Sequence, residues 1–289
     1  MDDHDDKPPA GLYIIATPIG NMADISLRAL EILGKVDFIA CEDTRESGKL
    51  LSVYDIEAPK LPYHEHNARE MRPQIIKLLQ EGSSIALISD AGMPLISDPG
   101  YKLVAACADA GLNVTCIPGA SASLAGLVLS GLPTDRFFFA GFLPPKTVAR
   151  KSALSEVKEI PGTLVFYETA PRLLDSLIDM QEILGNRPAA VARELTKKFE
   201  EVRRDTLQNL VAHYTAAGAP KGEIVIVVGA PREDDAKIWS DDALKDYLRD
   251  MIGKKGMSVK DAAAFMAAKS GRKKSEVYQM ALLLKQEMP

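Results

Sequence analysis

The chain has 289 residues, of which 46% are hydrophobic and 26% are charged. This composition supports a large hydrophobic core and, at roughly 150 residues per domain, predicts two lobes. The formal net charge of -5 excludes a uniformly basic nucleic-acid-binding protein, although a single face can still be basic.

Residues 1–10 are acidic and contain proline but no apolar run, which predicts a flexible tail and no targeting segment. No stretch has the roughly 18 consecutive apolar residues of a membrane span. The three cysteines form no CxxC pair and the histidines lack the spacing of a helical ligand pair, so we expect neither disulfides nor a metal site. Together these features predict a cytoplasmic protein.

Residues 11–132 alternate short apolar runs with amphipathic stretches, a pattern typical of an α/β fold with a mainly parallel sheet. We expect strands at residues 12–16, 38–41, 85–89 and 114–117. We expect helices at residues 25–33, 69–80, 101–110 and 121–129. The pattern defines an N-terminal α/β lobe.

A second α/β lobe is predicted for residues 133–231, after a break rich in glycine and proline. Its expected strands cover residues 137–140, 163–167, 189–192 and 224–228, and its expected helices cover 151–158, 171–184 and 206–215. A charged linker at 231–237 leads into residues 232–289, whose expected helices are 241–251, 259–268 and 274–285. This last section predicts a small, helix-turn-helix-like helical appendage.

Three turns rich in proline and glycine follow expected strands of the first lobe, at residues 17–21, 89–94 and 117–122. Ligands of open α/β sheets bind at the carboxyl ends of strands. Such turns also serve simply to reverse the chain, which is the commoner reason for their composition. Asp90 lacks that structural explanation, since a carboxylate at a strand end suits ribose hydroxyls or a cation, and Gly92 lets backbone approach a ligand.

The dinucleotide fingerprint GxGxxG is absent after the first strand, and the phosphate loop GxxxxGK[ST] is absent throughout. Charged residues also end two expected strands of the second lobe, around Glu168 and over residues 193–200. These charges are either exposed ion pairs of little energetic value or groups that face a common cleft.

Taken in chain order, eight stretches resemble the tetrapyrrole methylase superfamily, and within it the enzymes that methylate the 2′-oxygen of a decoding-centre cytidine in small-subunit (16S) ribosomal RNA. The stretches are ATPIGN, ACEDTR, SDAGMPLISDPG, IPGASA, FAGFLPPK, FYETAPR, ARELTK and GEIVIVV, which lie between residues 11 and 229. One departure is that residues 169–172 read Thr-Ala-Pro-Arg, where the family commonly has a histidine.

The resemblance implies a two-lobed α/β homodimer of the class III methyltransferases, with S-adenosylmethionine bound in the cleft between the lobes. Carried over by position, it implies that the cofactor contacts Pro18, Gly20, Asp90, Gly92, Met93, Ile96, Ser121, Ala122, Tyr167, Ala192, Gly222 and Glu223.

The expected reaction is in-line attack of a ribose 2′-oxygen on the methyl group, for which a base must remove a poorly acidic proton. We take Glu168 as the candidate base and Lys197 as the candidate group that stabilises alkoxide charge, because both lie at strand ends. Glu42, Asp43 and Glu194 are alternatives.

For binding to ribosomal RNA or the 30S particle, the sequence offers two groups of basic residues: Lys146, Arg150 and Lys151, and in the appendage Arg272, Lys273 and Lys274. An ordinary solvated helical face would also explain the second group. Two other functions fit the same motifs, namely methylation of a small tetrapyrrole such as a precorrin, and a non-catalytic role as an RNA-binding ribosome-assembly factor.

Overall fold

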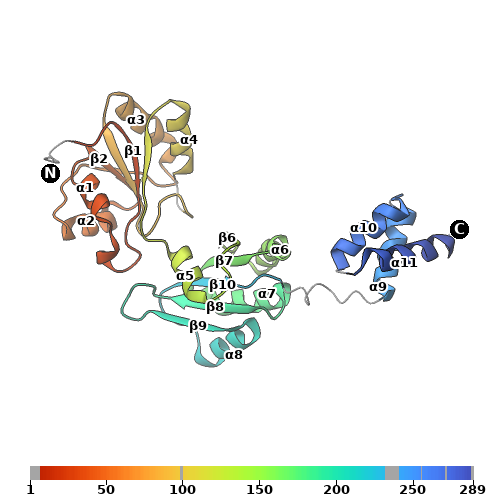
Figure 1. Cartoon of the computed structure of the whole chain (residues 1–289). Helices are drawn as coiled ribbons and strands as arrows, with labels where there is room; N and C mark the ends of the chain where they lie inside the picture. Colours follow the sequence, from red (N-terminus) through yellow and green to blue (C-terminus); the bar gives the residue numbers. More distant parts are fainter. Residues whose placement is uncertain (1–6, 98–99, 232–240, 255, 271, 288–289) are drawn as a thin grey trace.

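The computed structural model describes residues 7–97, 100–231, 241–254, 256–270 and 272–287. It contains two α/β lobes, each built on one five-stranded sheet, and a separate group of C-terminal helices (Figure 1). Most of the predicted tail and all but the first residue of the predicted charged linker lie outside the described residues. Within these ranges, no helix has both the length and the apolar character needed to cross a membrane.

The first sheet is parallel throughout, as the sequence predicted for this lobe. Its strands, in the spatial order β3-β2-β4-β1-β5, are β1 (Gly11–Ile15), β2 (Phe38–Cys41), β3 (Lys60–Pro62), β4 (Ser84–Ile88) and β5 (Val114–Ile117). Every residue of β1 and β4 is buried, because a parallel sheet is covered by helices on both faces.

Helices cover both faces of this sheet (Figure 1). They are η1 (Met22–Asp24), α1 (Leu27–Leu33), α2 (Thr44–Val53), α3 (Ala68–Gln80) and α4 (Tyr101–Asp109). Helices α1 and α2 form one apolar cluster with the sheet through Leu33 and Leu50. Helices α3 and α4 form another through Leu79 and Leu103. Two elements of this lobe were not predicted from the sequence: α2, whose first turn is capped by the Asp43 side chain, and the three-residue β3.

The second lobe is α/β, as the sequence predicted, but its sheet is mixed, unlike the parallel sheet of the first lobe. Its strands, in the order β6-β7-β10-β8-β9, are β6 (Phe137–Phe142), β7 (Thr163–Thr169), β8 (Pro188–Arg193), β9 (Glu201–Thr206) and β10 (Glu223–Val228). Only β6 and β7 pair in parallel, while β10 runs antiparallel to β7 and β8, and β9 antiparallel to β8.

Helix α5 (Ala122–Ser130), which the sequence analysis placed in the first lobe, packs on the second sheet instead. A Cβ atom added at Gly126 would lie 2.7 Å from Cγ1 of Val225, so the glycine allows the helix to approach β10 closely. Figure 1 shows α5 against this sheet. We therefore propose that the boundary between the lobes falls in the turn between β5 and α5, not at residue 132.

The opposite face of the second sheet carries η2 (Ala170–Arg172), α6 (Thr147–Val157), α7 (Leu173–Leu184) and α8 (Leu207–Ala217). Leu154, Leu177 and Leu210 from these helices pack against alternate strand residues such as Phe166. The two faces of β7 consequently differ: Phe166 points toward these helices, whereas its neighbour Tyr167 packs on the α5 side.

The C-terminal helices pack around a core of their own, as the sequence predicted for an appendage. They are α9 (Asp241–Arg249), the π-helical turn η3 (Asp250–Lys254), α10 (Val259–Ser270) and α11 (Lys274–Glu287). Leu248, Met266 and Val277 are among the residues of this core, which includes none from either sheet.

Candidate active site

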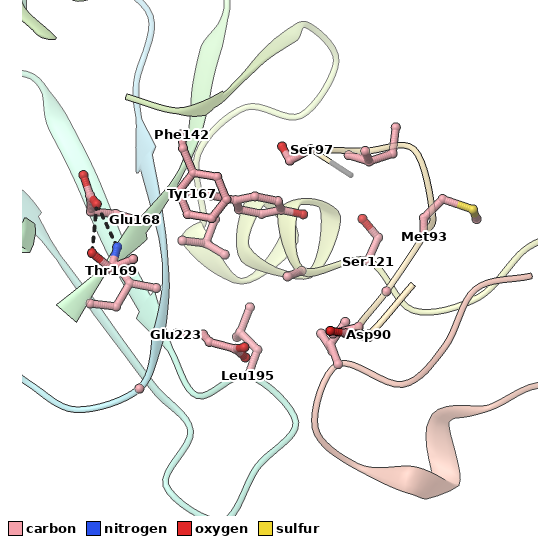
Figure 2. A pocket seen from close by; sticks show the side chains of 18 of the residues that line it. Asp90, Met93, Ser97, Ser121, Phe142, Tyr167, Glu168, Thr169, Leu195 and Glu223 are labelled. Atoms are coloured by element: carbon pink, nitrogen blue, oxygen red, sulfur yellow. Dashed lines mark hydrogen bonds between the residues drawn. The ribbon is translucent and has the colours of Figure 1, made fainter. Parts of the chain in front are cut away.

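A cavity of about 630 Å³ lies between the carboxyl ends of the first sheet and the α5 side of the second sheet (Figure 2). This volume is within the usual range for sites that bind small molecules and cofactors. The predicted cofactor residues that line it are Asp90, Gly92, Met93, Ile96, Ser121, Ala122, Tyr167, Gly222 and Glu223. Residues from both lobes therefore meet at one site.

Three of the predicted cofactor residues are not in the lining. Pro18 is buried in the turn after β1. Ala192 is fully buried in an apolar cluster with Ile19 and Leu195, which do line the cavity. Gly20 lies against the side chain of Lys197.

Two carboxylates reach the cavity from the first lobe. Glu42 directly follows β2, and Asp90 follows β4 by two residues; because Cys41 and Ile88 are paired in register, the two acids come together. Burial raises the pKa of Glu42, and the negative charge of Asp90 adds to the rise. Burial also raises the pKa of Asp90. The neighbouring Asp43 differs, because a hydrogen bond from the backbone N–H of Arg45 lowers its pKa.

The carboxylate of Glu168 is fully buried and already bonded on several sides. It accepts hydrogen bonds from the backbone N–H of Thr169 at 2.8 Å and from the Ser176 hydroxyl, and Nε of Arg172 lies 3.3 Å away. Figure 2 shows the Thr169 contacts. Although Glu168 borders the cavity, its carboxylate oxygens already interact with Ser176 of α7 and Arg172 of η2. This placement argues against Glu168 as the base that the sequence analysis favoured.

Lys197 lies in a contact between the lobes and not in the cavity lining. Its Nζ donates to Glu194 at 3.0 Å and to Glu223 at 2.9 Å. Burial lowers the pKa of Lys197, but these hydrogen bonds outweigh it and the net shift is upward. A Cβ atom added at Gly20 would lie 2.5 Å from Cγ of Lys197. Lys197 is thus a paired cation packed on the first lobe, which argues against a role in stabilising alkoxide charge.

Backbone strain concentrates beside the cavity. Among the residues that the structure describes, the non-glycine residues with positive φ are Asp55, Leu95 (72°), Ser97 (67°), Glu194 (50°) and Thr196 (65°). Leu95 and Ser97 flank Ile96, and Glu194 and Thr196 flank Leu195, so that one cavity-lining residue of each lobe lies between two strained neighbours. Each such residue costs on the order of 1–3 kcal/mol, and strain of this kind gathers at functional sites.

The cavity fits a ligand that combines a cationic group, hydroxyls and an apolar flat portion. Glu42 and Asp90 have no ion-pair partner among the described residues and would complement a positive charge. Hydroxyl groups come from Ser97, Ser121 and Tyr167. Apolar walls come from Ile19, Met93, Ile96, Leu195 and Val225. In the part of the chain that the structure describes, no group of three or more His, Cys, Asp or Glu residues could hold a metal ion.

Phe142 also lines the cavity, although it was not predicted from the sequence. Phe142 is paired in register with Tyr167, and their ring centroids lie 5.4 Å apart (Figure 2). The register shifts at Gly141, which has a φ of 67°. A glycine inside an aromatic strand is a signal of such a bulge and could have pointed to this residue.

The predicted RNA-binding residues differ in their exposure and in their ion pairs. Arg150 is 2% exposed, and its Nε donates to Asp179 at 2.6 Å, so its placement contradicts the predicted RNA contact. Lys151 is partly exposed and paired with Glu182 at 2.7 Å, and Arg272 is paired with Asp241 at 2.6 Å. Lys146, Lys273 and Lys274 are exposed. Of the six predicted RNA-binding residues, these three are exposed and have no ion pair with another described residue.

Family models match most of the chain. A model described as "Tetrapyrrole (Corrin/Porphyrin) Methylases" matches residues 11–211, which include the first lobe and most of the second. A second model, described as "RsmI C-terminal HTH domain", matches residues 254–285 of the helical appendage.

Two relatives that align over most of this chain have the same name. A protein of Mesorhizobium japonicum named "Ribosomal RNA small subunit methyltransferase I" is 51% identical over 95% of this chain and 92% of its own length. A protein of Haemophilus influenzae with the same name is 46% identical over 94% of this chain and 96% of its own.

Solved structures have a similar fold but low sequence identity to this chain. Diphthine synthase matches 75% of this chain and 89% of its own with a TM-score of 0.60 and 16% identity. A cobalt precorrin-4 methyltransferase matches 75% of this chain and 94% of its own with a TM-score of 0.56 and 18% identity. At these identities the similarity concerns the fold alone.

Proposed function

The chain belongs to the tetrapyrrole methylase family, and from this premise we propose that it methylates small-subunit ribosomal RNA, with S-adenosylmethionine as methyl donor. The name shared by its relatives supports the substrate. The proposed acceptor is the ribose 2′-oxygen of a decoding-centre cytidine in 16S rRNA. The protein acts as a homodimer in the cytoplasm.

The observation that carries the proposal is the cavity in which unpaired carboxylates face hydroxyl and aromatic side chains. S-adenosylmethionine, when bound, supplies a methyl group on a positively charged sulfur, from which an attacking oxygen displaces a neutral thioether. Its cationic groups suit the charge of Asp90, and its ribose hydroxyls suit Ser121. The apolar walls formed by Met93, Ile96 and Leu195 suit its adenine ring.

Within this site Glu42 is the base. It lines the cavity, has no hydrogen bond or ion pair to hold its carboxylate among the described residues, and has a raised pKa. A carboxylate in this state accepts a hydroxyl proton more readily than one bonded to a cation. Glu168 orders the start of α7 through Ser176 and Arg172. Lys197 holds the second lobe against Gly20.

The substrate is tested by supplying S-adenosylmethionine with a tritiated methyl group together with either unmethylated small ribosomal subunits or a precorrin. We expect label in the ribosomal RNA and none in the precorrin. The reverse result would make the protein a tetrapyrrole methyltransferase. Cofactor binding without transfer to either substrate would favour a non-catalytic ribosome-assembly factor.

The cofactor site is tested separately by calorimetry. Asp90→Ala removes a cavity carboxylate whose one hydrogen bond within the described residues comes from the backbone N–H of Asp43 at 3.4 Å. The variant should therefore fold normally and bind S-adenosylmethionine more weakly, by about tenfold or more. Unchanged affinity would place the cofactor elsewhere.

A further inference from the structure

A second cavity, of about 490 Å³, lies in the C-terminal lobe beside the loop between β8 and β9. Its walls come from this loop, from the C-terminal half of α8, and from the segment that leads into β10. No residue assigned above to the cofactor or to proton transfer lines this cavity, whereas Glu194, which pairs with Lys197, does.

Aromatic side chains are available in this cavity. Phe199 is 65% exposed, which is unusual for a large apolar ring, and Nζ of Lys198 lies 5.7 Å from its centroid. The His213 ring packs edge-on against Tyr214 at 4.9 Å. Tyr214 is buried, so Phe199 is the exposed ring of this group, and an exposed aromatic ring of this kind is a surface on which an unstacked nucleic-acid base can stack.

The carboxylates at this cavity each have a cationic partner. Glu201 accepts a hydrogen bond from Arg193 at 2.8 Å, and Glu194 accepts one at 3.0 Å from Lys197, which also donates to Glu223. Lys221 is exposed and has no ion pair in the described ranges. A free ammonium group next to stacking surfaces suits the phosphate that accompanies each base.

The two cavities share a wall. Glu194 lines the second cavity while Leu195 lines the first, and in the same way Lys221 lines the second while Gly222 lines the first. The backbone N–H of Glu194 donates to the carbonyl of Glu223 at 3.0 Å, which joins the two segments into one wall. A single RNA strand whose ribose enters the first cavity can therefore place a nearby nucleotide in the second.

We propose that the second cavity binds a single-stranded nucleotide close to the methylated one, with its base against Phe199 and its phosphate at Lys221. The proposal rests on the proposed function, since it assumes an RNA substrate. It gives the C-terminal lobe a recognition role: a flanking nucleotide seated behind the shared wall fixes which ribose reaches Glu42. A small tetrapyrrole would have no use for this cavity.

The kinetic test compares Phe199→Ala and Lys221→Ala with Leu27→Ala, a control that removes an 86% exposed apolar side chain from the first lobe. The substrate is unmethylated small ribosomal subunits. We expect each cavity variant to raise the KM for subunits by about tenfold, the loss typical of one stacked base or phosphate contact. The affinity for S-adenosylmethionine and the thermal midpoint should match those of the control. A KM within about twofold of the control in both variants overturns the proposal.

A second measurement identifies what the cavity holds. A photoreactive phenylalanine derivative in place of Phe199 should crosslink to small-subunit RNA within a few nucleotides of the methylated ribose. A crosslink to a ribosomal protein, or only to distant RNA, overturns the proposal. If the unmodified enzyme methylates RNA while the variants behave as the control, this proposal alone fails; an unmodified enzyme that methylates no RNA overturns the proposed function as well.

Discussion

The two lobes bring carboxylates to the same cavity in different states. In the first lobe, Glu42 and Asp90 have no ion-pair partner among the described residues and carry raised pKa values. In the second lobe, Glu168 lies beside Arg172 and Glu223 is bonded to Lys197. A carboxylate bonded to a cation stabilises structure, whereas a free and partly buried one can take up a proton. On the proposed mechanism, proton transfer belongs to the first lobe and positioning to the second.

The largest expected effect comes from Glu42→Gln, which keeps the shape of the side chain but removes the proton acceptor. A positioned base contributes about 10²–10⁴-fold, so the single-turnover rate of RNA methylation, measured with saturating S-adenosylmethionine, should fall by that factor. The matched control is Glu168→Gln, whose rate should stay within about tenfold of the unmodified enzyme. If Glu168→Gln were the more damaging change, the roles of the two lobes would be reversed.

The next largest effect is expected at the buried ion pair of Arg150 and Asp179, whose side chains are 3% and 5% exposed. Arg150→Met leaves Asp179 buried next to Lys151 alone, 3.7 Å away. Removing one partner of a buried pair costs about 3–5 kcal/mol, which urea unfolding should detect. Adding Asp179→Leu should restore most of the loss. A marginal loss of unfolding free energy in the single variant, together with weakened RNA binding, would instead support Arg150 as an RNA-binding residue.

A smaller effect is expected at the contact between the lobes. Gly20→Ala places a methyl group 2.5 Å from Cγ of Lys197, and overpacking of this kind costs about 1–3 kcal/mol. Thermal unfolding should show the loss, and Lys197→Ala should relieve it when combined with Gly20→Ala. Equal losses in the single and double variants would mean that Lys197 does not rest on Gly20 in solution.

The smallest effect is a shift in the pH profile. The pKa of Glu42 lies above its usual 4.5, partly because of the charge of Asp90. Since the base must be unprotonated, the single-turnover rate should rise with pH through this raised pKa. Asp90→Asn removes the charge and should move the midpoint to lower pH by a fraction of a unit. A midpoint that moved to higher pH would mean that deprotonation of Glu42 does not cause the rise in rate.

The same pKa shifts make the stability of the fold fall as the pH rises, whereas the reaction rate rises with pH. The folded protein binds protons at Glu42 and Asp90 more tightly than the unfolded chain, whose values are close to 4.5 and 3.8. These groups therefore contribute stability that is fully present below about pH 3.8 and is lost as the pH rises through their folded-state values.

The sequence predicted well those features that local patterns encode. The bounds of β2 and β5 were predicted to the residue, because apolar runs bounded by turns define them. The turns around Asp90 and Ser121 were predicted to meet at one site, because the carboxyl ends of strands in an open α/β sheet share one edge. The helix α2 was missed, since TRESGKLLSV contains a glycine and buries few apolar residues.

What local patterns do not encode is the partner of each charge. Glu168 ends a strand as Glu42 does, and only the packing of α7 against the sheet reveals that Ser176 and Arg172 occupy it. Arg150 belongs to a basic stretch, yet Asp179 on α7 buries it. The antiparallel β9 reads as a charged loop, because its side chains are paired across strands, as in Arg193 and Glu201.

The most direct test of the account is the position of the transferred methyl group. Unmethylated small ribosomal subunits are incubated with the protein and S-adenosylmethionine, and nuclease digests of the ribosomal RNA are analysed by mass spectrometry. The account predicts one cytidine that gains a methyl group on its 2′-oxygen, and no gain with Glu42→Gln over the same time. A methyl group on a base, or no methylated nucleotide while the cofactor binds, would contradict it.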